Sequence, residues 1–177
     1  MRKSLYERLE RLISCLDTLA PAFGYKVGQL SIRVFEALRD LATQQMLFDK
    51  KVLEILTESP SLTQEEAEGQ AAKWISPVKN NVPVHSTGAA VDIRLWDDLH
   101  SSCIDMGPFG AIWGKNDLAP TFADEATTTQ KQNRLLLLLA ASEAGLTNYP
   151  FEFWHFSYGD RYASFWHGEP VARYNSL

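Results

Sequence analysis

The stretch HSTGAAVD at residues 85–92 is followed further along the chain by EFWH at residues 152–155. Two imidazoles and one carboxylate, from His85, Asp92 and His155, suit a Zn²⁺ ion and leave its fourth position open for water. The glutamate that begins the second stretch is placed to take a proton from that water. A site that only stabilised the fold would usually have four protein ligands. The pattern therefore predicts a zinc hydrolase with one Zn²⁺ per chain.

A strand is predicted over residues 90–95, with Ala90 and Asp92 on one face and apolar residues on the other. Gly88 permits the tight turn that brings His85 back towards Asp92. In the alternative interpretation, His85 is a surface-loop imidazole and Asp92 an exposed strand residue. This stretch alone does not decide between the two.

The second stretch lies in an aromatic segment, residues 151–156, which also predicts a strand. On a regular strand Glu152 and His155 would point to opposite faces, so reaching one metal requires a bulge or a strand end. The alternative is a buried aromatic strand that carries an incidental Glu and His. An ionised Glu152 is costly to bury without a partner, and a zinc-bound water would supply one. This argument favours the metal site.

These residues also carry a family resemblance. The pattern H-x-x-G-x-A-x-D followed by E-x-W-H resembles the zinc D-Ala-D-Ala metallopeptidases, and within them the D-alanyl-D-alanine dipeptidases. Three further stretches fit, and these are FEALR at 35–39, DMG at 105–107 and WHFSYGD at 154–160. The resemblance covers roughly residues 25 to 175. It implies hydrolysis of the D-Ala-D-Ala dipeptide, with Glu152 as the general base.

The resemblance also implies a role for Arg39, which would hold the oxyanion that forms when water attacks the amide carbonyl. Arg33 is the competing candidate, and a surface arginine at a helix start is the simpler alternative. The segment QQMLF at residues 44–48 favours Arg39 over Arg33.

The chain departs from the pattern of the dipeptidases at two positions that bear on the choice of substrate. Dipeptidases of the family usually carry a serine two residues before the first histidine, where this chain has Pro83. They also carry an acidic residue shortly after Met-Gly, which resembles a pocket for the substrate's free amine. Residues 108–111 here are PFGA, without a carboxylate, and Asp105 and Asp117 are the candidates to replace it. Zinc chemistry is therefore better supported than strict dipeptide specificity.

Two alternative functions stay open. A D,D- or L,D-carboxypeptidase or an endopeptidase would act on cell-wall stem peptides, and the missing acidic residue favours it. The chain shows no wall-binding module or repeat, which argues the other way. A non-catalytic, zinc-stabilised binding domain is the third hypothesis, but such a domain would not need both Glu152 and Arg39.

The composition of the chain restricts which partners and which cellular location are expected. The 177 residues carry a net charge of −5 without a Lys/Arg cluster, which argues against nucleic acid or an anionic membrane. A small peptide is the predicted partner. The N-terminus lacks the apolar segment of a secretory signal, and the longest apolar run, 135–141, is too short to span a bilayer. Cys15 and Cys103 are predicted to be free thiols, and the predicted location is the cytoplasm.

Hydrophobic periodicity predicts helices over residues 4–19, 40–57, 63–74 and 127–144, and a further strand over 30–35. Asp40 is the predicted N-cap of the second helix, and Thr63 with Glu66 forms a predicted capping box. The expected fold is α+β, a small mostly antiparallel sheet flanked by helices. We expect a single domain over residues 1–177, with residues 1–24 as an N-terminal helical extension and the metal site formed by 85–92 and 152–155.

Overall fold

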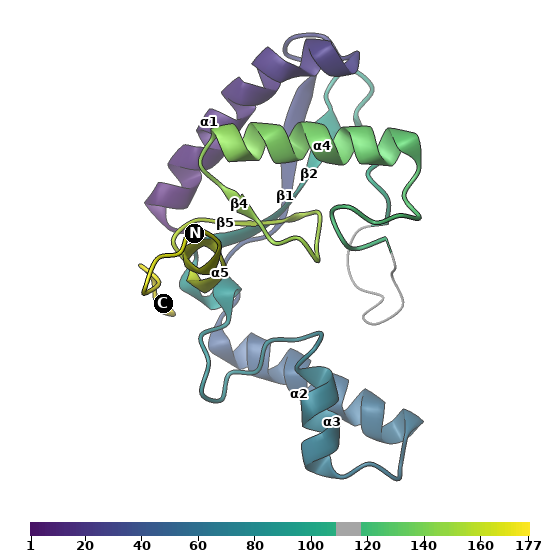
Figure 1. The fold of residues 1–177 in the computed structure, drawn as a ribbon, viewed down its shortest axis with the longest axis vertical. Helices are drawn as coiled ribbons and strands as arrows, with labels where there is room; N and C mark the ends of the chain where they lie inside the picture. Colours follow the sequence, from purple (N-terminus) through teal and green to yellow (C-terminus); the bar gives the residue numbers. More distant parts are fainter. Residues whose placement is uncertain (109–117) are drawn as a thin grey trace.

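A computed structural model describes residues 1–108 and 118–177 (Figure 1). Its helical elements, the 3-10 turns η1 and η2 included, are α1 (Lys3–Leu19), η1 (Ala20–Phe23), α2 (Leu41–Glu58), α3 (Gln64–Ala71), η2 (Val84–Thr87), α4 (Thr128–Glu143) and α5 (Arg161–Trp166). Its strands are β1 (Leu30–Glu36), β2 (Ala90–Asp97), β3 (Ser102–Cys103), β4 (Thr147–Asn148) and β5 (His155–Ser157). Helices α2 and α3 pack on each other at one end of the elongated molecule (Figure 1).

The described strands form one five-stranded sheet in the order β1-β2-β5-β4, with β3 pairing with β2 beyond that path. Each of its strand pairs is antiparallel. Helices α1 and α4 cover one face of the sheet (Figure 1). The structure therefore confirms the predicted α+β fold with a small antiparallel sheet flanked by helices.

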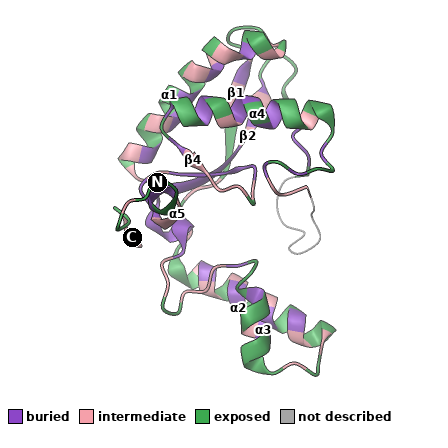
Figure 2. Cartoon of the chain, in the orientation of Figure 1, coloured by how far each residue is buried: buried purple, intermediate pink, exposed green. Residues whose placement is uncertain are grey.

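The main hydrophobic core lies between this sheet and the inner faces of α1 and α4, where Figure 2 shows most of the buried residues. Helix α1 contributes four leucines that recur at helical spacing, Leu5, Leu9, Leu12 and Leu16. Strand β2 contributes Val91, Ile93 and Leu95, which alternate with the ligand-side residues as predicted. Helices α2 and α3 share a smaller core of their own.

Local signals in the sequence fix several element ends. Asp40 caps α2 by accepting from the backbone N–H of Thr43, and Thr63 with Glu66 forms the predicted capping box of α3. Helix α3 ends at Ala71, earlier than predicted, because residues 72–74 form turns. Neither cysteine is in a disulfide, as predicted. None of the helices within the described ranges is long and apolar enough to cross a membrane.

The prediction of a strand over residues 151–156 is wrong for its first part. Residues 151–154 form turns, and β5 begins only at His155. Two local backbone hydrogen bonds cause this, because Glu152 N–H donates to Tyr149 O and His155 N–H donates to Glu152 O. Two of the aromatic residues are buried within the turn, with Phe153 1% and Trp154 6% exposed, whereas Phe151 is 64% exposed.

Candidate metal centre

The first ligand candidate, His85, lies on η2, which ends at Gly88 with a φ of 66°. This left-handed conformation is one that glycine adopts at little cost. The turn reverses the chain so that His85 Nε2 lies 3.4 Å from Oδ1 of Asp92 on β2. The sequence-predicted return of His85 towards Asp92 is therefore present in the structure.

Strand pairing brings the third candidate to the same point. Asp92 and His155 are opposite each other in the β2–β5 ladder, and His155 Nδ1 lies 3.0 Å from Asp92 Oδ1. The same nitrogen lies 3.2 Å from His85 Nε2. Two ligand atoms bound at 2.0–2.1 Å to a tetrahedral zinc ion are about 3.3 Å apart. The three atoms thus already have the mutual spacing of a zinc ligand set, on side chains that are all buried.

The orientation of His85 is fixed by its other ring nitrogen. Nδ1 of His85 donates to the backbone oxygen of Ala37 at 2.9 Å, which leaves Nε2 as the acceptor that faces the cluster. Metal-binding histidines commonly donate their second N–H to a carbonyl or carboxylate in this way. Arg39 N–H in turn donates to His85 O at 3.2 Å, so the segment after β1 holds η2 from both sides.

The charges of the cluster are coupled. Burial alone would raise the pKa of Asp92, but the hydrogen bond from His155 and the nearby ring of His85 outweigh it and hold that pKa well below its usual range. For His155, burial acts to lower the pKa, whereas the bond to Asp92 and its charge raise it above the usual value. A carboxylate that stays ionised between two imidazoles is the charge arrangement that a divalent cation requires.

Glu152 lies beside the cluster without joining it. Its Oε2 is 3.8 Å from His155 Nδ1, and 27% of its side chain is exposed. Because Glu152 is in the turn before β5 and His155 is the first strand residue, the requirement for a strand end is met. Burial raises the pKa of Glu152, opposed chiefly by the charge of His155. A carboxylate with a raised pKa at the edge of a cation site suits proton transfer.

Arg39 lies beside the cluster, because its backbone N–H bonds to His85 O, and its positive charge acts to lower the pKa of Glu152. Its Nε donates to Glu36 Oε1 at 2.6 Å, its Nη2 donates to Glu36 Oε2, and its Nη1 donates to Gln44 Oε1 at 2.9 Å. A guanidinium has five N–H donors, so two remain for another group. Arg33, the competing candidate, instead stacks on Trp96 and pairs with Asp98 at the surface.

Sequence reasoning missed the residues that hold Arg39. Gln44 is 2% exposed and donates to Ser76 O at 2.7 Å, although a polar residue on an amphipathic helix gives no sign of burial. Glu36 could have been found from the sequence, because it has the opposite charge and lies three residues before Arg39.

Two acidic residues were candidates to bind the substrate amine. Asp105 already accepts hydrogen bonds from Gly107 N–H and from Gln130, and Asp117 lies outside the described residues.

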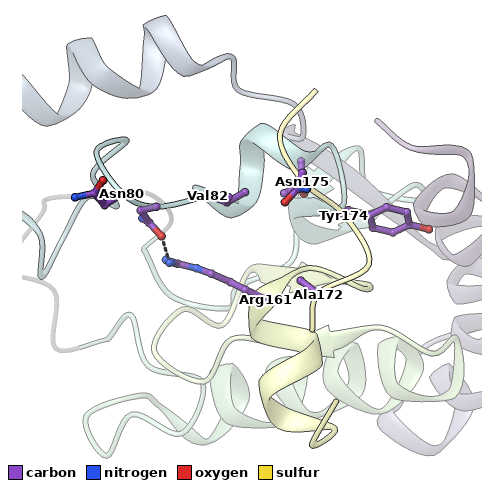
Figure 3. A pocket seen from close by; sticks show the side chains of 8 residues that line it. Asn80, Val82, Arg161, Ala172, Tyr174 and Asn175 are labelled. Carbon is purple, nitrogen blue, oxygen red and sulfur yellow. Dashed lines mark hydrogen bonds between the residues drawn. The ribbon is translucent and has the colours of Figure 1, made fainter. Parts of the chain in front are cut away.

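A cavity of about 380 Å³ opens between the loop at Asn80 and the C-terminal segment at Tyr174 and Asn175 (Figure 3). Arg161 reaches into its wall and donates to Asn81, along the dashed line in Figure 3. None of the three metal-ligand candidates lines this cavity. It is a separate feature that opens to the surface.

Comparison with known proteins assigns the chain to a family. The profile of the D-ala-D-ala dipeptidase family matches residues 19–171. A D-alanyl-D-alanine dipeptidase of Synechocystis sp. (strain ATCC 27184 / PCC 6803 / Kazusa) is 30% identical over 180 residues, which cover 91% of this chain and 70% of that protein.

Two solved structures are similar at a TM-score of 0.47 each. One is a mutant of the vancomycin resistance D,D-pentapeptidase VanY in complex with Zn(II), 19% identical over 93% of this chain and 79% of that one. The other is VanYB in complex with D-alanine-D-alanine, 20% identical over 93% and 77%. By the family profile and the 30% identical relative, the chain belongs to the D-ala-D-ala dipeptidase family of zinc metallopeptidases.

Proposed function

We propose that this protein hydrolyses the D-Ala-D-Ala dipeptide at a zinc ion held by His85, Asp92 and His155. The observation that carries the proposal is the spacing of 3.0 to 3.4 Å among the three buried ligand atoms. The family and the dipeptidase relative support the substrate. When bound, zinc supplies a Lewis acid that lowers the pKa of water to about 7. The domain would comprise residues 1–177.

Glu152 is the proposed general base. Its carboxylate accepts the proton of the attacking water and then passes that proton to the leaving amine, so the residue is restored after each turnover. Its position beside His155 Nδ1, at 3.8 Å, keeps it close to the metal without making it a ligand. Its partial exposure leaves room for a substrate amide between the carboxylate and solvent.

Arg39 is the proposed oxyanion stabiliser. Its guanidinium is fixed by Glu36 and Gln44, so its two remaining donors are oriented before the substrate arrives. Donors that are already oriented stabilise developing charge without a cost of reorganisation during the reaction.

A second candidate function is cleavage of longer cell-wall peptides as a D,D- or L,D-carboxypeptidase or endopeptidase. The observation that favours it concerns the substrate amine, because residues 108–111 carry no carboxylate. The nearby Asp105 is already bound by Gln130 and by Gly107 N–H.

The decisive experiment measures D-alanine release from D-Ala-D-Ala by the purified protein, together with its metal content. We expect about one zinc per chain, loss of activity with a chelator and recovery with zinc. An N-blocked stem peptide is tested in parallel, because only a dipeptidase requires the free amine. Release from the blocked peptide alone would favour the second candidate, and zinc-independent release would contradict both.

A further inference from the structure

Two buried polar atoms next to the metal centre have no hydrogen-bond partner among the described residues. One is Nε2 of His155, and the other is Oδ2 of Asp160. Asp160 is 0% exposed and His155 is 2% exposed. An unpaired buried ring nitrogen and an unpaired buried carboxylate oxygen each cost free energy, so such atoms are uncommon in folded proteins.

The two atoms belong to the same side of the sheet. His155 and Ser157 are two residues apart on β5, so their side chains share a face. Ser157 Oγ donates to Asp160 Oδ1 at 2.8 Å, which places Asp160 on that face. It is also the face of the metal centre, because His155 pairs with Asp92 on β2. The negative charge of Asp160 acts on the ring of His155.

The carboxylate of Asp160 is held in one orientation. Its Oδ1 accepts both from Ser157 Oγ and from the backbone N–H of Ala163, the second at 2.9 Å, and thereby caps α5. One oxygen therefore serves the helix, and the other is left for a different donor.

We propose that Asp160 is a positioning residue for the metal centre, with Oδ2 accepting the Nε2–H of His155 through one buried water. The inference rests on the proposed function, because it requires Nδ1 of His155 to be the metal ligand. Histidine bound to metal through Nδ1 carries its proton on Nε2. His85 has the matching arrangement, with its Nδ1–H on Ala37 O. Asp160 would fix the ring of His155 and make it a stronger donor to zinc.

Asp160→Asn tests this role. Asparagine caps helices as well as aspartate does, so the amide oxygen can keep the bonds to Ser157 and Ala163. The amide NH₂ then replaces Oδ2 and offers the bridging water a donor in place of an acceptor. We expect the zinc dissociation constant to rise about 10- to 100-fold. The melting temperature of the zinc-free variant should stay close to that of the wild type.

Asp40→Asn is the matched control, since Asp40 is the N-cap of α2 and accepts from Thr43 in the same way. We expect it to leave the zinc dissociation constant unchanged. Equal zinc affinity of the Asp160→Asn variant and the wild type would overturn the inference and leave the proposed function intact. An equal loss of zinc affinity in both variants would also overturn the inference, because removing the charge of any helix cap would then have the same effect.

A nitrogen-15 imidazole spectrum of the zinc-loaded wild type gives a readout that does not depend on how the variant folds. We expect Nδ1 of His155 to carry the shift of a metal-bound nitrogen and Nε2–H to be protected from exchange. A freely exchanging Nε2–H would refute the role of Asp160. If His155→Ala bound zinc as tightly as the wild type, both the inference and the proposed site would fail.

Discussion

Glu152 combines two properties of a general base, a pKa that burial raises and a position 3.8 Å from the metal-side nitrogen of His155. Glu152→Gln keeps the size of the side chain and removes its ability to accept a proton. We expect kcat to fall about 10²- to 10⁴-fold while zinc binding is retained. Steady-state kinetics beside a metal assay measure both, and turnover close to the wild type would remove Glu152 from the mechanism.

Arg39→Lys separates charge from geometry at the oxyanion position. Lysine keeps the charge but cannot reproduce the paired bonds to Glu36 or leave two oriented donors. We expect a fall in kcat of about 10²- to 10³-fold, with zinc affinity unchanged. Arg33→Lys, on the exposed surface, is the control and should keep wild-type kinetics. A fall in both variants would speak against a specific role for Arg39.

The sequence identified the candidate ligands because their types and order are chemically distinctive, and the structure brings His85, Asp92 and His155 together. Their roles, and that of Glu152, stay predictions. The supporting residues could not be predicted in the same way. Gln44 and Asp160 are both buried, and a single polar residue in a helix or at a cap looks the same in the sequence whether it is buried beside a site or exposed.

At the level of elements, prediction succeeded where local chemistry sets the ends. Asp40 and Thr63 begin α2 and α3 through their own side-chain bonds, which the sequence displays directly. It failed over residues 151–154, where an aromatic run was predicted to be a strand. Burial in a turn and burial in a strand require the same residue types, so the distinction depends on backbone bonds to Tyr149 that composition does not reveal.

The end of β2 depends on Asp97, which accepts from the backbone N–H groups of Leu99 and His100 and from the side chains of Gln29 and His100. The bond with the His100 ring, the largest cause, lowers the pKa of Asp97 from 3.8 to about 2. Between these values the unfolded chain binds more protons than the folded one. The stabilisation is therefore complete above about pH 4 and is lost as the pH falls through 2.

Asp97→Asn should lower the free energy of unfolding at pH 7 and reduce its fall between pH 5 and pH 2. Chemical denaturation at several pH values measures both effects. Asp98→Asn removes the same charge from the adjacent position, where the side chain makes one ion pair with Arg33, and should cost less at pH 7. If the free energy of unfolding of the Asp97→Asn variant fell between pH 5 and pH 2 as much as that of the wild type, the expectation would be contradicted.

For the whole molecule, α1 matters more than the family match suggests, because the match begins at residue 19, the last residue of the helix. Leu12 is 0% exposed in the main core, whereas Ile13 on the same helix is 39% exposed. We expect Leu12→Ala to lower the free energy of unfolding by about 2–5 kcal/mol. Ile13→Ala should cost much less. Similar small losses from both variants would show that α1 is a dispensable extension.

The proposed metal centre joins parts of the chain that are far apart in sequence. It links η2, β2 and β5, and through Ala37 also the segment that follows β1. A ligand that binds only the folded state at 100 times its dissociation constant stabilises that state by about 2.7 kcal/mol. For a chain of this size, that free energy corresponds to a rise in melting temperature of roughly 5–10 °C.

We therefore expect chelation to lower the melting temperature of the wild type by that amount and re-addition of zinc to restore it. The matched variant is His155→Ala, which removes one ligand and should melt at the same temperature with and without zinc. Calorimetry at fixed protein and zinc concentrations measures the shift. A zinc-dependent rise that persisted in the His155→Ala variant would place the stabilising ion elsewhere in the chain. If the rise is confined to proteins with all three ligands, the ion that stabilises the fold is bound where the proposed reaction takes place.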